Sequence, residues 1–116
     1  MNDEQIKELC ASVYGYTPKR VVPFQQTLNY NITTAFTPTP AIDLENPVLI
    51  ESFHFAHSKK VAGMENYISL GVTASTSKTM QVYQNNCMKM LVKSIKVTSS
   101  QVGDVDLTIF GWKCVF

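Results

Sequence analysis

The two histidines are the residues whose type and spacing come closest to a metal site. His54 and His57 stand three positions apart in the segment Phe-His-Phe-Ala-His-Ser. Imidazole is a common zinc ligand, but on an extended strand this spacing places the two rings on opposite faces. They could share one ion only if the strand ended or bulged between them and Cys87 or Cys114 supplied a further ligand. The alternative is one ring hydrogen-bonded near the core and one at a strand end, where either could titrate near neutral pH.

Two aspartates near the C-terminus form the second candidate for ion binding. Asp104 and Asp106 follow Gly103 and alternate onto one face of an extended segment. With a backbone carbonyl they could hold calcium, but this ion takes about six to eight oxygen ligands, so two carboxylates are too few. Gly-Asp is also ordinary turn chemistry. We therefore interpret this segment as a polar turn that leads into a strand.

No segment carries the spacing of a catalytic motif. The sequence lacks a phosphate loop, a dinucleotide-binding fingerprint, a nucleophile elbow and a helical pair of zinc histidines. Cys10, Cys87 and Cys114 are odd in number and too widely spaced for a zinc knuckle or a redox motif. Cys10 and Cys114 fall on apolar faces, where a thiol behaves as a small hydrophobe. We predict a protein that is not an enzyme, holds no cofactor or metal and keeps its cysteines reduced.

Length, charge and hydropathy restrict the class of protein. The chain has 116 residues, 45% of them hydrophobic and 16% charged, with a formal net charge of +1. This size predicts a single domain over residues 1–116 with a core of its own. The near-neutral charge argues against nucleic acid as a partner, because such binders carry clustered positive charge. We expect no membrane partner and no secretory signal, because the start is polar and no apolar run reaches the roughly 18 residues of a membrane span.

Residues 2–14 predict one short amphipathic helix. A single apolar stripe recurs at helical spacing and consists of Ile6, Leu9, Cys10 and Val13. Asn2 or Asp3 can cap the first turn, Gln5 stands where a capping-box partner would, and Gly15 ends the helix. A helix of this length is marginal alone, so the stripe must pack on its own domain or on a neighbouring copy.

The rest of the chain has the composition and period of β-strands. From residue 20 onward it is rich in Val, Thr, Ile, Tyr, Phe and Trp, with apolar residues at alternate positions. Short strands at this spacing, separated by polar turns, predict an all-β fold. We expect an antiparallel, jelly-roll-like β-sandwich of about six to eight strands, with segments near 28–36, 48–56, 67–74, 79–83, 90–98 and 105–116.

The segment 37–47 departs from the strand pattern because it holds three of the five prolines. Proline cannot donate to a sheet ladder, so this segment predicts an extended, polyproline-like connection. Ile42 and Leu44 lie between the prolines as apolar anchors. They suit an arm that crosses to a neighbouring copy, and the alternative is an ordinary loop over its own core.

The last strand is apolar on both faces. Val105, Leu107 and Ile109 alternate with a second apolar set that includes Phe110, Trp112 and Phe116. This pattern predicts a central strand or a strand covered by a partner.

The segment from Met90 to Gly111 resembles the strand, Ser-rich turn and strand that end small bacteriophage virion β-sandwich proteins. The resemblance covers about a fifth of the chain. Proteins of this kind serve as capsid decoration, head-fibre or tail components and form oligomers through sheet surfaces and extended arms. The resemblance implies a virion component that is assembled in the cytoplasm of the host cell.

The leading hypothesis is a structural or assembly protein that contacts copies of itself and a virion or other protein scaffold. Its interface would be carried by Ile6, Leu9, Val13, Ile42, Leu44, Trp112 and Phe116. The alternative is a ligand-binding β-sandwich module, such as a carbohydrate-recognising one. There, one of the aromatic side chains would stack on a sugar, with the candidates Tyr30, Tyr67, Tyr83 and Trp112.

Overall fold

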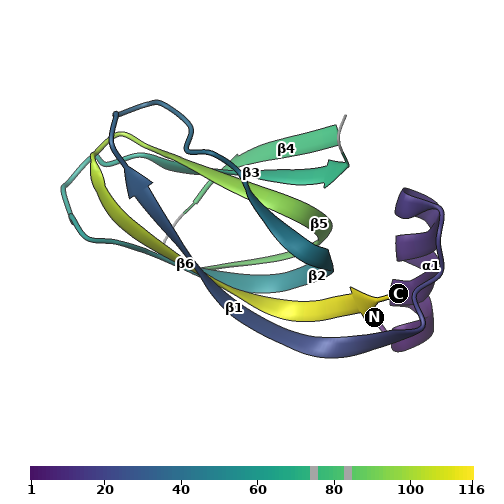
Figure 1. Cartoon of the computed structure of the whole chain (residues 1–116). Coiled ribbons are helices and arrows are strands. Elements are labelled where there is room, and N and C mark those ends of the chain that lie inside the picture. The colour runs from purple at the N-terminus through teal and green to yellow at the C-terminus, as the bar shows by residue number, and fades with distance from the viewer. Residues whose placement is uncertain (74–75, 83–84) are drawn as a thin grey trace.

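The computed structural model describes residues 1–73, 76–82 and 85–116, and for residues 85–88 it describes the backbone alone. The elements in chain order are a helix α1 (Asp3–Tyr14) and the strands β1 (Arg20–Ile32), β2 (Ile42–His57), β3 (Asn66–Thr73), β4 (Thr76–Gln81), β5 (Asn85–Ser99) and β6 (Gly103–Val115) (Figure 1). The expected all-β class with one short N-terminal helix is confirmed. The strands are longer than the alternation of apolar residues predicts. The first strand was expected near residues 28–36, whereas β1 begins at Arg20 and ends before Phe36.

The strands of the described residues form one antiparallel sheet in the order β1-β6-β2-β5-β3-β4. The pairing is nested, because the first strand pairs with the last, the second with the fifth and the third with the fourth. The β1–β6 ladder runs without a break from Arg20↔Val115 to Ile32↔Gly103. The predicted central position of the last strand is confirmed, because β6 also pairs with β2.

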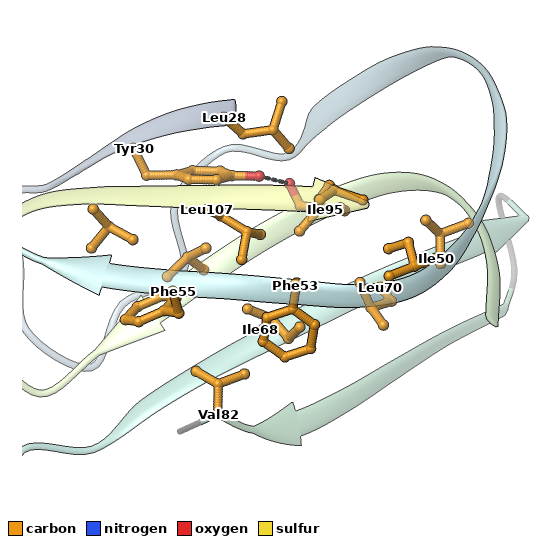
Figure 2. Close-up of a cluster of buried hydrophobic side chains, with 14 of the residues drawn as sticks. Leu28, Tyr30, Ile50, Phe53, Phe55, Ile68, Leu70, Val82, Ile95 and Leu107 are labelled. Atoms are coloured by element: carbon orange, nitrogen blue, oxygen red, sulfur yellow. Dashed lines mark hydrogen bonds between the residues drawn. The ribbon is translucent and has the colours of Figure 1, made fainter. Parts of the chain in front are cut away.

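The main core lies on one face of this sheet, which curls around it. β1 and β5 are not neighbours in the sheet, yet the Tyr30 hydroxyl donates a hydrogen bond of 2.7 Å to the Ile95 carbonyl (Figure 2). Burial raises the pKa of this hydroxyl. The enclosed side chains come from several strands and include Leu28, Ile50, Phe53, Phe55, Ile68, Leu70, Val97, Val105, Leu107 and Ile109.

Helix α1 begins and ends as its sequence predicts. The Asn2 side chain accepts from the Gln5 amide at 2.9 Å, and the Gln5 side chain accepts from the Asn2 amide at 3.0 Å. These reciprocal bonds form a capping box that satisfies two amides at the helix start. Gly15 ends the helix in the left-handed conformation with φ of 81°. A residue without Cβ adopts this conformation at little cost.

The apolar stripe of α1 packs on the face of the sheet that points away from the main core. Ile6 and Cys10 are fully buried there with side chains from four strands, namely Val21, Leu49, Leu91 and Cys114. Leu9 and Val13 are half-buried against the same cluster. The helix therefore covers Cys114 and part of Trp112 on the second apolar face of β6, whereas Phe110 and Phe116 stay exposed.

The connection before β2 follows its own core, and its boundary differs from the prediction. The Thr39 amide donates to the Val97 carbonyl at 2.8 Å, and the Thr39 hydroxyl accepts from the Val97 amide at 3.1 Å. Pro38 and Pro40 flank Thr39 and precede β2, so neither has to donate to the sheet ladder. The polyproline-like segment ends at residue 41, because Ile42 already pairs with Ile95 in β5. A bulge then accommodates residues 44–47, whose bonding to β5 is interrupted.

Gly111 lies where β6 approaches a second irregularity in β2. The register of β2 shifts between Ile50 and Ser52 on both of its sides. A Cβ added at Gly111 would stand 1.9 Å from the Leu49 carbonyl oxygen, which is backbone and cannot rotate away. At Gly71 in β3, a Cβ would meet the Ser94 hydroxyl at 2.2 Å, which is a movable side-chain atom.

We predict that Gly111→Ala lowers the free energy of unfolding by about 3 kcal/mol or more, because the backbone of two strands must separate. Gly71→Ala should cost less, and adding Ser94→Ala to it should restore most of the loss. Urea denaturation followed by circular dichroism measures all three variants. Equal losses for Gly111→Ala and Gly71→Ala would show that the close approach at Leu49 does not constrain the fold.

Candidate functional site

The histidines occupy opposite faces of β2, as their spacing predicts. His54 is exposed, whereas His57 is buried at the end of the strand. The His57 Nδ1 accepts from the Lys59 amide at 2.9 Å, so its Nε2 carries the proton and donates to the Gln101 carbonyl at 3.1 Å. Both ring nitrogens thus have backbone partners that a metal ion would displace. Cys87, the further ligand considered for such a site, has a side chain outside the described residues.

The two aspartates share one face of β6, and each accepts a hydrogen bond from an asparagine of the neighbouring strand β1. Asp104 accepts from the Asn31 side-chain amide at 3.0 Å, and Asp106 accepts from the amide of Asn29. These pairs form an exposed polar ladder between β1 and β6. Among the described residues, no group of three or more His, Cys, Asp or Glu side chains is arranged to hold a metal ion.

Two of the cysteines lie together under the helix. Cys10 and Cys114 are both fully buried and share a side-chain hydrogen bond. Burial raises the pKa of Cys114 to about 12, and the neighbouring Cys10 adds to the shift. Burial also raises the pKa of the adjacent Tyr14 hydroxyl to about 12, and this hydroxyl donates to the Val72 carbonyl of β3.

The exposed aromatic residues differ from those chosen from the sequence. Tyr30 is buried, and the Tyr67 hydroxyl donates to Glu65 at 3.1 Å. Tyr83 lies outside the described residues. The most exposed aromatic side chains are Tyr16 at 73%, Phe36 at 66%, Phe116 at 44% and Phe110 at 38%. Only Phe116 of these was a predicted interface residue. Tyr16 and Phe36 lie outside the helix and strands, where the alternation of apolar residues carries no signal.

A cleft of 560 Å³ opens where the end of α1 meets the ends of β1 and β6. We call it the helix-end cleft, and its aromatic lining is formed by Tyr14, Tyr16 and Phe116. Pro47 from the bulge of β2 adds apolar surface, and the polar lining comes from Thr17, Lys19, Glu45, Asn46 and Lys93. The cleft therefore combines an aromatic centre with side chains of both charges.

A second hollow of 370 Å³ lies on the outer face of the sheet beside the helix. We call it the Trp112 groove, and its lining is Pro23, Phe24, Gln25, Glu51, Phe110, Gly111 and Trp112. Gln25 pairs with Phe110 in the β1–β6 register. Further along the same two strands lies the polar pair Asn29↔Asp106. It thus places aromatic rings next to amide and carboxylate groups.

The seven predicted interface residues fall into three groups. Ile6 and Leu44 are buried by their own chain, so they present no side-chain surface to a partner in this structure. Leu9, Val13, Ile42 and Trp112 are half-buried against the two clusters of the same chain. Phe116 is 44% exposed and lines the helix-end cleft. Among the described residues, no helix is both long enough and apolar enough to span a membrane.

We predict that stability falls as pH rises from about 9 to about 12. Tyr14 and Cys114 hold their protons in the folded chain to about 12, whereas their ordinary pKa values are 10.0 and 9.0. The unfolded chain therefore releases protons first, and alkaline pH favours it. Urea denaturation at several alkaline pH values measures the slope, which Tyr14→Phe should reduce, with Tyr16→Phe as the matched control. An unchanged slope in Tyr14→Phe would contradict this account.

No protein-family model matches the chain, and no curated protein matches it. A functional proposal therefore rests on the surfaces described above and on the resemblance of the C-terminal segment.

Proposed function

We propose that the protein is a non-enzymatic assembly protein, a virion component of the capsid-decoration, head-fibre or tail type. It acts through contacts with copies of itself and with a protein scaffold, and it is assembled in the cytoplasm of the host cell. The observation that carries the proposal is the helix-end cleft, where Tyr16 and Phe116 remain exposed beside the cluster that the helix covers.

The composition of the cleft supports a protein interface. Stable interfaces combine a centre enriched in aromatic side chains with a polar rim that remains accessible to water. Tyr16 and Phe116 provide the aromatic centre, while Lys19, Lys93 and Glu45 provide a rim of mixed charge. Mixed charge suits a contact between copies, because a lysine of one copy can face a glutamate of the next.

The pairing of the strands supports a jelly-roll-like arrangement of the sheet. A jelly roll arises when a long hairpin folds on itself, so that the first strand pairs with the last and the inner strands pair in turn. The nested order of β1 with β6, β2 with β5 and β3 with β4 follows this pattern. We infer a jelly-roll-like sandwich in which the curled sheet provides the two layers around the core.

We expect the protein to be a homo-oligomer at micromolar concentration and Phe116→Ser with Tyr16→Ser to weaken association about tenfold or more. Removing exposed aromatic rings takes away contact surface without opening the core. Analytical ultracentrifugation and native mass spectrometry measure the distribution of species. Phe36→Ser is the matched control, because Phe36 is 66% exposed but lies in the connection before β2. A monomeric wild-type protein would contradict the proposal.

The Trp112 groove favours carbohydrate recognition as a second candidate function. Sugar rings stack on aromatic faces, and their hydroxyls bond to amide and carboxylate groups. The groove offers both, from Phe110 and Trp112 of the central strand β6 and from Gln25 of β1 and Glu51 of β2.

Binding of a sugar in this groove should change the fluorescence of Trp112, the one tryptophan in the sequence. We expect Gln25→Ala to weaken such binding about tenfold, because a hydrogen bond to the sugar is lost. Gln26→Ala is the matched control, because Gln26 is an adjacent exposed glutamine on the opposite face of β1. Titration with a panel of oligosaccharides tests the idea, and an unchanged spectrum with every sugar would rule out this candidate.

A further inference from the structure

Cys10 and Cys114 come from opposite ends of the chain and meet between the helix and the sheet. Cys10 lies on the buried stripe of α1, and Cys114 of β6, which pairs with Val21 of β1, belongs to the same buried cluster. Both side chains are fully buried. Both thiols belong to one buried cluster, and each is a cause of the pKa shift of the other.

We propose that Cys10 and Cys114 form a site of covalent modification, at which a low-molecular-weight disulfide oxidises the two thiols to an intramolecular disulfide between α1 and β6.

The reaction is a pair of thiol–disulfide exchanges that balances without any other reagent. The thiolate of one cysteine attacks a sulfur of oxidised glutathione, breaks its disulfide bond and releases one glutathione thiolate. The second cysteine then attacks the mixed disulfide at the protein sulfur and releases the second glutathione. Two electrons pass to oxidised glutathione, and the two thiol protons end on the two glutathione molecules.

The surroundings favour the closed product. An apolar layer encloses the two sulfur atoms and consists of Ile6, Leu9, Leu49, Leu91 and Trp112. A glutathione adduct would place a charged tripeptide in this layer, which carries a large desolvation cost. Closing the disulfide expels that tripeptide and requires the two neighbouring sulfur atoms to approach to about 2.05 Å.

The order of the two exchange steps follows from the difference in pKa between the two thiols. Burial raises the pKa of both thiols, but the interaction with Cys114 offsets part of the rise at Cys10, whereas Cys10 adds to the rise at Cys114, which reaches about 12. Cys10 therefore supplies the first thiolate. Both side chains are fully buried, so the reagent reaches them only through a transient local opening of this layer. The reaction is accordingly slow at neutral pH and faster in mild alkali.

The test uses the full-length chain with Cys87→Ser, which leaves Cys10 and Cys114 as the two thiols. After incubation of the native protein with oxidised glutathione in mild alkali, we expect an intact mass lower by two hydrogen atoms. Peptide mapping without reductant should join the peptides that contain Cys10 and Cys114. The melting temperature should rise by several degrees and return when reductant is added, because the bond closes a very long loop.

The control is Cys10→Ala in the same background, which has one thiol and should show neither the mass loss nor the reversible rise in melting temperature. Alanine suits the helix and avoids a buried unpaired hydroxyl. Free thiols, a stable glutathione adduct or an intermolecular dimer as the main product of the Cys87→Ser protein would each overturn the proposal. The result is independent of whether the protein assembles on a virion or binds a sugar.

Discussion

The rest of the structure depends on the packing of β6, which contacts the main core along one face and the helix at the end of the other. Val105, Leu107 and Ile109 face the main core, while Cys114 and Trp112 face the helix on the other side. A strand with two apolar faces is stable only in the interior of a sheet with a layer on each side. β1 and β2 supply its neighbours, the curled sheet supplies one layer, and α1 supplies the other. The short helix is thus part of the fold, and the surface left for partners shifts to its end.

Much of this arrangement could be predicted because it depends on local signals. The apolar stripe of α1 and its caps depend on residues that are close together in the sequence. The alternation of Val105, Leu107 and Ile109 likewise identifies a strand directly. The ends of the strands were harder to predict from the sequence. Ile42 joins a strand among prolines because Thr39 and Ile42 find partners on β5, and such long-range pairing leaves no local pattern in the sequence.

The candidate surfaces also combine residues that a local sequence pattern identifies with residues whose exposure depends on tertiary packing. Phe116 could be proposed from the sequence because it ends an apolar strand, but Tyr16 could not, since a tyrosine in a turn carries no periodic signal. Sequence reasoning also placed Ile6 and Leu44 at a partner because their apolar character was plain, although their coverage by the same chain depends on tertiary packing. For His57, spacing predicted its face, while its two backbone partners depend on where two separate loops meet.

The nested pairing has a consequence for the order in which the protein can form. β1 leaves the ribosome early, but its partner β6 consists of residues 103–115, near the end of the described chain. The outer half of the sheet must therefore wait until synthesis reaches these residues, and β1 and the stripe of α1 remain uncovered in the meantime. Contacts this distant in sequence slow folding and leave strand edges open to aggregation. The middle hairpin of β3 and β4, with its neighbours β2 and β5, is the part that can assemble first.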